Sequence, residues 1–231
     1  MFIFLDTETT GTGPEDRLRQ IAFKPERGPG VCETFNPGRP VSIDAMSIHH
    51  ITNRMVQSKP PFRGSDTHAQ LQSLVRNEGN VIVAQKAQFD VDMLNREGIY
   101  PPLVICILKL ARYLDKNGVI PKYNLQYLRY FLDLEIEATP HNALGEILVL
   151  EGVFSRINTK FQGNPELDDP VEEMIRISNG PILIARMPFD KHEGLLFSEV
   201  PPDYLEWLLT TELDEDVEFT VKKYLEGVSG E

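Results

Sequence analysis

The chain has 231 residues, of which 41% are hydrophobic and 25% are charged, and its formal net charge at pH 7 is −12. This length is enough to bury one core of ordinary domain size and a small additional module. No apolar stretch approaches the roughly 20 residues that a membrane-spanning helix needs, and no basic start precedes an apolar signal region. We therefore expect a cytoplasmic protein with no membrane partner.

The apolar runs, taken in chain order, predict three early strands followed by alternating helices and strands. The predicted strands cover residues 2–5, 18–23, 31–35, 81–84 and 104–106. The predicted helices cover residues 65–77, 88–97, 109–114, 125–132 and 143–157. This order is typical of an α/β fold in which helices flank a mixed sheet.

The chain is predicted to divide into a main domain and a small C-terminal module. Residues 158–168 are mostly polar and include Gly and Pro, which indicates a linker. The main domain would then cover residues 1–157 and the module residues 169–231.

The module is expected to have an α+β structure. Residues 182–185 and 194–196 are predicted to pair as a hairpin, and residues 201–209 and 214–225 to form helices. Trp207 lies between two leucines on one of these helices, so we expect it in the core rather than exposed for base stacking.

The first predicted strand ends in two acidic residues, Asp6 and Glu8. Side chains alternate along a strand, so both carboxylates point to one face and repel each other unless a cation lies between them. A hard divalent cation such as Mg²⁺ takes oxygen ligands and leaves room for substrate phosphates, which favours phosphoryl chemistry. The alternative is a strand that ends in a solvated polar turn, because D-x-E is a short and common pattern.

Two later clusters place further acidic residues at helix starts. Asp90 lies in the first turn of the helix that follows the buried strand at 81–84. His141 precedes Glu146 by five residues at the start of another predicted helix. Five residues turn about 140° past a full helical turn, so the two side chains converge only if His141 lies at the loose helix entrance. These clusters favour the metal-site interpretation.

The order of the three motifs resembles that of the DEDDh 3′→5′ exonucleases: D-x-E after the first strand, F-D opening a middle helix, and H-x4-acid opening a later helix. Polymerase proofreading subunits, ribonuclease T and oligoribonuclease belong to this superfamily. Residues 42–52, 105–112 and 189–225 are similar to the bacterial exonuclease X group, so the resemblance covers nearly the whole chain. It implies a ribonuclease H-like exonuclease fold for the main domain.

The resemblance also implies an activity and a set of site residues. The expected reaction is a 3′→5′ exonuclease reaction that releases nucleoside 5′-monophosphates from single-stranded or duplex DNA ends, with a role in repair. The implied ligands of two Mg²⁺ ions, for which Mn²⁺ can substitute, are Asp6, Glu8, Asp90 and Glu146. His141 would take a proton from the attacking water. The residues expected to hold the terminal nucleotide are Thr7, Thr9, Thr10 and His49, while Lys86 is either a phosphate contact or a solvated loop lysine.

Three features depart from the pattern of the superfamily. Position 146 is glutamate where aspartate is usual, and Gln85 and Lys86 replace the usual His-Asn pair of the second motif. The net charge of −12 predicts weak, distributive contact with nucleic acid, because affinity for phosphates comes largely from Lys and Arg. The alternatives are therefore a proofreading or RNA-trimming exonuclease and a catalytically weakened nucleic-acid-binding or interaction module. The sequence indicates no oligomeric state.

Overall fold

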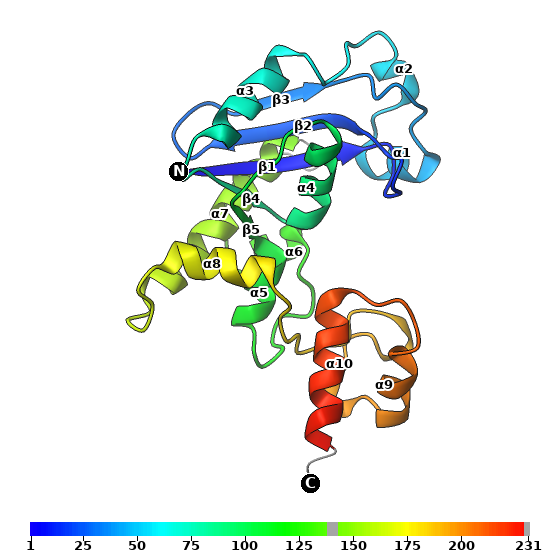
Figure 1. Cartoon of the computed structure of the whole chain (residues 1–231), viewed down its shortest axis with the longest axis vertical. Helices are drawn as coiled ribbons and strands as arrows, with labels where there is room; N and C mark the ends of the chain where they lie inside the picture. Colours follow the sequence, from blue (N-terminus) through cyan, green and yellow to red (C-terminus); the bar gives the residue numbers. More distant parts are fainter. Residues whose placement is uncertain (138–142, 229–231) are drawn as a thin grey trace.

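A computed structural model describes residues 1–137 and 143–228 of the chain. Its strands form one five-stranded sheet in the order β3-β2-β1-β4-β5, so that β1 lies at the centre (Figure 1). The strand bounds are β1 Phe2–Thr9, β2 Leu18–Pro25, β3 Val31–Thr34, β4 Val81–Ala84 and β5 Val104–Cys106. The pairs β1–β2 and β2–β3 are antiparallel, and β4 is parallel to both β1 and β5, which confirms the predicted mixed sheet.

The helices of the main domain cover both faces of this sheet. Their bounds are α1 Ile43–His49, α2 Asn53–Val56, α3 Asp66–Arg76, α4 Ala87–Arg96, α5 Ile107–Leu114, α6 Leu125–Phe131 and α7 Ala143–Gln162. The five predicted strands and the five predicted helices of this domain are all present, with ends that differ by a few residues. The short helices α1 and α2 were not predicted, although Ser42 caps α1 by accepting a hydrogen bond from the Ala45 N–H at 3.1 Å.

Alternation along β1 divides its apolar side chains between two cores. Ile3 and Leu5 are buried in a cluster that also contains Leu71 of α3. Phe4 faces the opposite side, where α7 covers the sheet. On that side Phe154 of α7 makes edge contacts with Phe2 and Phe4, with ring centroids 4.6 and 5.6 Å apart. The central strand is therefore held between α3 on one face and α7 on the other.

The C-terminal part is mainly helical. It contains α8 Pro170–Asn179, α9 Pro202–Leu208, α10 Glu215–Val228 and two short 3₁₀ helices at Asp190–His192 and Phe197–Glu199. The helix α8 lies beside α5 and β5, while α9 and α10 lie at the end of the molecule away from β1 (Figure 1). The expected hairpin is reduced to a single antiparallel bridge between Arg186 and Leu196. Trp207 is 51% exposed, so the prediction of a core tryptophan is wrong: it faces outward from α9, while Tyr204, Leu205 and Leu208 are buried.

The segment predicted as a linker is helical in its first half. α7 continues to Gln162, because Phe161 extends the apolar stripe of that helix and is buried against the ring of Tyr113. α8 then packs beside β5, where the Ser178 hydroxyl accepts a hydrogen bond from the Cys106 N–H at 2.8 Å. One apolar cluster continues from the sheet into the C-terminal helices. The division into separate domains stays a prediction.

Asp216 of α10 contacts both the segment that follows α8 and Lys109 of α5. The Asp216 carboxylate accepts a hydrogen bond from the Ile182 N–H at 3.1 Å and lies 3.3 Å from the ammonium nitrogen of Lys109.

Within the part of the chain that the structure describes, none of the helices has the length and apolar character needed to cross a membrane.

Candidate active site

The predicted carboxylates of β1 face the helix that carries Glu146. Asp6 and Glu8 share a face with Phe4, which packs under Phe154 of α7. From Phe154 back to Glu146, α7 rises about 12 Å, and β1 advances about 13 Å over four residues, so Glu146 comes to lie over the end of β1. The matching lengths explain how residues 140 positions apart meet.

Asp90 joins the same place from the neighbouring element. β4 runs parallel to β1, and α4 begins just beyond the end of β4, so the first turn of α4 lies beside the last residues of β1. The Thr7 N–H and hydroxyl both donate to Oδ1 of Asp90, at 3.1 and 2.7 Å. Asp90 is only 5% exposed. These two hydrogen bonds fix the buried carboxylate against the central strand.

The electrostatics show that the four carboxylates act on one another. Burial raises the pKa of Asp6 well above its usual range, and the charges of Asp90, Glu8 and Glu146 raise it further. Burial also raises the pKa of Glu8 to about 7, with Arg19 opposing this change and Glu146 adding to it. Burial raises the pKa of Asp90 to about 7 against the hydrogen bonds from Thr7, which favour its charged form. The structure thus brings Asp6, Glu8, Asp90 and Glu146 together.

The chemistry of this cluster fits a hard divalent cation. All four side chains offer oxygen atoms, which are the ligands that Mg²⁺ and Mn²⁺ prefer. Their charged forms are disfavoured by burial and mutual repulsion, and a bound cation reverses both effects. As placed in residues 1–137 and 143–228, no three His, Cys, Asp or Glu side chains lie close enough together to hold a metal ion. The carboxylates are close enough to share an electrostatic field, and their role as ligands stays a prediction.

The predicted threonines are engaged inside the protein. Thr7 holds Asp90, while the Thr9 hydroxyl donates to the Gly11 carbonyl at 2.7 Å. The Thr10 hydroxyl donates to Oδ1 of Asp16 at 2.6 Å, which closes the loop between β1 and β2. All three threonines are buried. They shape the loop beside the carboxylates, and their contact with a nucleotide stays a prediction.

The remaining predicted residues lie around the same end of the sheet or outside the described residues. His49 is the last residue of α1 and is half-buried, with its Nδ1 accepting a hydrogen bond from the Ile51 N–H at 3.1 Å. Gln85 begins the turn after β4, and its side chain donates to the Tyr123 carbonyl at 2.6 Å. Lys86 is exposed at the start of α4. His141 lies outside the described residues.

Lys86 lies at the edge of a cavity of about 760 Å³ between the main domain and the C-terminal part. Three further cations line it, namely Arg112, Lys122 and Arg186. Glu193 also lines the cavity, which begins at the turn between β4 and α4 and carries more positive than negative side chains. This arrangement favours the phosphate-contact interpretation of Lys86 over that of a solvated lysine.

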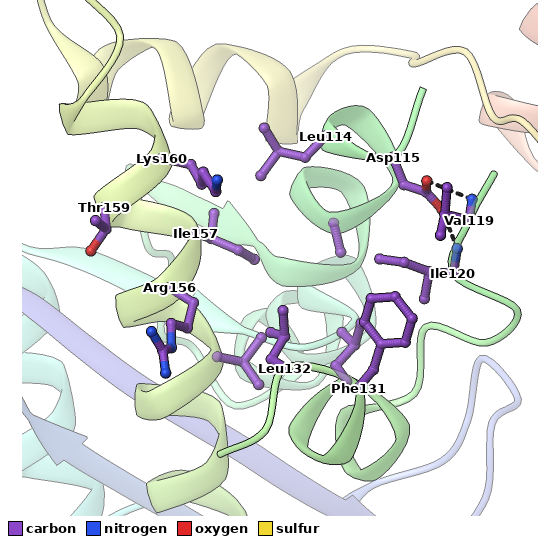
Figure 2. Close-up of a pocket in the computed structure, with 13 residues that line it drawn as sticks. Leu114, Asp115, Val119, Ile120, Phe131, Leu132, Arg156, Ile157, Thr159 and Lys160 are labelled. Atoms are coloured by element: carbon purple, nitrogen blue, oxygen red, sulfur yellow. Dashed lines mark hydrogen bonds between the residues drawn. The ribbon is translucent and has the colours of Figure 1, made fainter. Parts of the chain in front are cut away.

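A second cavity of similar volume, about 760 Å³, is separate from the acidic cluster. Figure 2 shows its lining from α5, α6 and α7, which is mostly apolar and includes Leu114, Ile120, Phe131 and Leu132. Arg156, on its rim, is ten residues along α7 from Glu146, a distance on the order of 15 Å. This cavity offers no carboxylate cluster and is not part of the candidate active site.

Sequence analysis missed Arg19, which enters the site from β2. It is completely buried and acts electrostatically on Glu8 and on His49. A single arginine in a predicted strand is normally interpreted as an outward-facing, solvated residue. No motif in the sequence indicates that Arg19 is buried instead.

Comparison with known proteins identifies the family. The model of the RNase T family, described as "Exonuclease", matches residues 3–150. Exodeoxyribonuclease 10 of Escherichia coli strain K12 is 30% identical over 207 residues, which is 85% of each chain. A DNA polymerase III subunit epsilon-like protein of Rhodobacter capsulatus is 29% identical over 172 residues, covering 68% of this chain and 23% of the relative.

Solved structures agree with the fold. A structure described as exonuclease X in complex with 5′ overhanging duplex DNA superposes with a TM-score of 0.59 at 26% identity, covering 78% of this chain and 100% of that chain. A zinc-bound complex of E. coli exonuclease I with single-stranded DNA has a TM-score of 0.57 at 20% identity, over 69% of this chain and 40% of that one, which supports the fold alone. The sheet order and the acidic edge define a ribonuclease H-like nuclease domain. The chain belongs to the RNase T exonuclease family, within the DEDDh superfamily.

Proposed function

We propose that this protein is a metal-dependent 3′→5′ exonuclease that releases nucleoside 5′-monophosphates from DNA and acts in repair. The electrostatic coupling of Asp6, Glu8, Asp90 and Glu146 near the end of β1 carries the proposal, because acids that repel one another can approach a phosphodiester only with a cation between them. The relative named exodeoxyribonuclease 10 and the DNA complex of exonuclease X support DNA as the substrate.

The four carboxylates would hold two Mg²⁺ ions, with Mn²⁺ able to substitute. When bound, these ions supply positive charge that stabilises the attacking and leaving oxygens of an in-line displacement. Thr7 orients Asp90 through its two hydrogen bonds, which favour the charged form against the effect of burial. Glu146 would contribute a ligand oxygen from α7. Its side chain is one methylene longer than the aspartate usual in the superfamily, so the position of α7 decides whether this ligand fits the metal geometry or strains it.

We assign to His141 the removal of a proton from the attacking water. An imidazole with an ordinary pKa near 6.5 is half ionised close to neutral pH and can accept that proton and release it again. The assignment follows from its place five residues before Glu146 and from the resemblance to the DEDDh motif.

The cavity lined by Lys86, Arg112, Lys122 and Arg186 would guide the strand that leads to the active site. Its cations attract phosphates locally in a chain whose net charge is −12. Arg112 is partly occupied by Tyr123 and Asp216, so Lys86 and Lys122, both exposed, are the cations most available to DNA. The double variant Lys86→Gln/Lys122→Gln should weaken DNA binding, whereas Lys160→Gln at the apolar cavity should not.

Two other functions are possible alternatives. A proofreading or RNA-trimming exonuclease would use the same carboxylates, and the helical C-terminal part argues against it by resemblance. A catalytically weakened binding or interaction module would retain the fold and lack turnover, which the substitution of glutamate at position 146 and the acidic net charge favour.

Cleavage of 5′-labelled single-stranded DNA and RNA in Mg²⁺, Mn²⁺ or EDTA, resolved as a ladder, separates these functions. We expect stepwise shortening of DNA from its 3′ end with either metal and none in EDTA. Asp6→Ala should abolish it, and Asp92→Ala should not, because Asp92 is exposed on the same helix as Asp90. Undiminished cleavage in EDTA, or release of the labelled 5′ nucleotide first, would contradict the proposal, and preferred cleavage of RNA would favour the RNA-trimming alternative.

A further inference from the structure

Arg19 occupies an irregular position in β2. Glu8 pairs with Gln20 and Thr9 pairs with Leu18, so Arg19 has no partner on β1 and forms a β-bulge. Bulges redirect the side chain of the extra residue and are frequent beside active sites. Here the bulge lies directly opposite Glu8, one of the four carboxylates of the candidate active site.

The Arg19 side chain is buried and unpaired. It is 0% exposed, and none of its three guanidinium nitrogens has a hydrogen-bond partner among the described residues. Glu8 is its nearest opposite charge in electrostatic terms, yet no ion pair forms between them. Burial lowers the pKa of Arg19 to about 10, with Glu8 opposing this change, so the group is still charged at neutral pH. A buried charge without a partner is strongly unfavourable, and proteins retain one mainly where function needs it.

His49 presents a second donor beside this arginine. Because its Nδ1 accepts a hydrogen bond from the Ile51 N–H, the neutral ring carries its proton on Nε2. Nε2 is buried, and no described atom meets hydrogen-bond geometry with it, although the Thr9 backbone lies close enough to act on the ring. Burial and then the charge of Arg19 lower the pKa of His49 to about 4, so the ring is neutral at pH 7.

Arg19 therefore offers donors that lack an acceptor, and His49 offers a further N–H group beside them. A guanidinium offers a rigid fork of N–H groups that matches the oxygens of a phosphate, and an imidazole N–H can donate to the same group. Glu8, the nearby carboxylate, faces Asp6 and Glu146 and is not bonded to either donor.

We infer that Arg19 and His49 form a phosphate-binding subsite beside the carboxylates, which takes either the internucleotide phosphate of the 3′-terminal strand or the 5′-phosphate of the released nucleotide. The inference rests on the proposed function. Both sources offer the same oxyanion, and they differ in whether the ligand is an oligonucleotide or a nucleoside monophosphate.

Entry of a phosphate requires a small movement of α1. This helix has seven residues and only Ala45 is buried, whereas Ile43 and Ile48 are 80% and 68% exposed. His49 ends the helix and is half-buried, and its ring lies close enough to Arg19 for the two to act on each other electrostatically. A short helix with a single buried residue can shift at low energetic cost, which exposes both donors together.

Binding measured without metal tests the subsite independently of turnover. In EDTA, calorimetry with thymidine 5′-monophosphate and with thymidine reports the nucleotide source, and fluorescence anisotropy with a 3′-ended oligodeoxynucleotide reports the strand source. We expect Arg19→Leu to weaken binding of at least one phosphate ligand by tenfold or more, and Arg19→Lys to retain part of it. Thymidine binding should not change, and the control Arg54→Leu, an exposed arginine of α2, should bind as the parent does.

Thermal unfolding separates a functional from a structural arginine. If Arg19 is kept for phosphate, Arg19→Leu should unfold at a higher temperature than the parent, because an unpaired buried charge is removed. A structural arginine would instead unfold earlier on substitution and leave phosphate binding unchanged. If Arg19→Leu does not fold, Arg19→Met provides the same comparison.

The inference is wrong if the parent binds neither phosphate ligand in EDTA, or if Arg19→Leu binds both as tightly as the parent does. If Arg19→Leu loses affinity only for the monophosphate, the subsite binds the 5′-phosphate of the released nucleotide. If it loses affinity only for the oligonucleotide, the subsite binds the internucleotide phosphate of the strand. A parent that binds phosphate through Arg19 but cleaves no nucleic acid would overturn the proposed function and leave the subsite intact.

Discussion

Stability in the absence of metal should fall as the pH rises from about 4 to about 7, because the folded protein keeps buried carboxylates protonated. Burial raises the pKa of Asp90 from 3.8 to about 7, which corresponds to about 4 kcal/mol of free energy between its two protonation states. The unfolded chain ionises Asp90 near pH 4, while the folded protein holds its proton to about pH 7. The contribution of Asp90 to the free energy of unfolding is therefore fully present below pH 4 and is lost as the pH rises through 7. A carboxylate whose pKa is lowered in the folded protein behaves in the opposite way, because it stabilises the fold at high pH.

The variant Asp90→Asn isolates this effect. The Asn amide oxygen can still accept the two hydrogen bonds from Thr7, but the side chain cannot ionise. In urea unfolding with EDTA, the parent should lose about 2–4 kcal/mol more than Asp90→Asn between pH 4 and pH 7.5. Asp92→Asn, an exposed residue of the same helix, should follow the parent.

Addition of Mg²⁺ should complete the pattern. At pH 7.5 the metal should restore stability to the parent by binding the folded state, and should restore less to Asp90→Asn. Parallel pH curves for the parent and Asp90→Asn would refute the reasoning, since they would show that the Asp90 proton is not part of the folding equilibrium.

Three further predictions concern turnover and binding. His141→Ala should lower turnover by roughly 10²–10⁴-fold and leave Mg²⁺ affinity near that of the parent, whereas Asp6→Ala should abolish both turnover and Mg²⁺ binding. Equal losses of Mg²⁺ affinity in the two variants, measured by calorimetric titration, would contradict this prediction. If the longer glutamate side chain strains the arrangement of metal ligands, Glu146→Asp should raise turnover with Mg²⁺ and reduce any preference for Mn²⁺ over Mg²⁺. Kinetics identical to those of the parent with both metals would show that Glu146 is no ligand. Lys86→Gln/Lys122→Gln should make the plot of log affinity for single-stranded DNA against log salt concentration less steep by about 1.4, because two phosphate contacts are lost. An unchanged slope in anisotropy titrations would show that neither lysine contacts the strand.

Local rules determined the parts of the site that lie on one element. The apolar runs located all five strands, because strand residues must fill two cores, and β1 continues beyond its apolar run to Thr9. Alternation along β1 placed Asp6 and Glu8 on one face before any tertiary information was available. Asp90 was predictable for the same reason, since a helix that follows a buried strand starts at the sheet edge where β1 also ends.

Tertiary packing decided the features that depend on how two elements meet. The bulge at Arg19 arises from the register between β1 and β2, which no single strand encodes, and only that register turns a strand arginine toward Glu8. The continuation of α7 through the polar segment after 157 depends on burial of Phe161 against Tyr113. The exposure of Trp207 depends on which face of α9 meets the core. Sequence alone thus indicated the family and placed Asp6 and Glu8 on one face, while side-chain burial between distant elements decided where the unpaired cation of Arg19 lies.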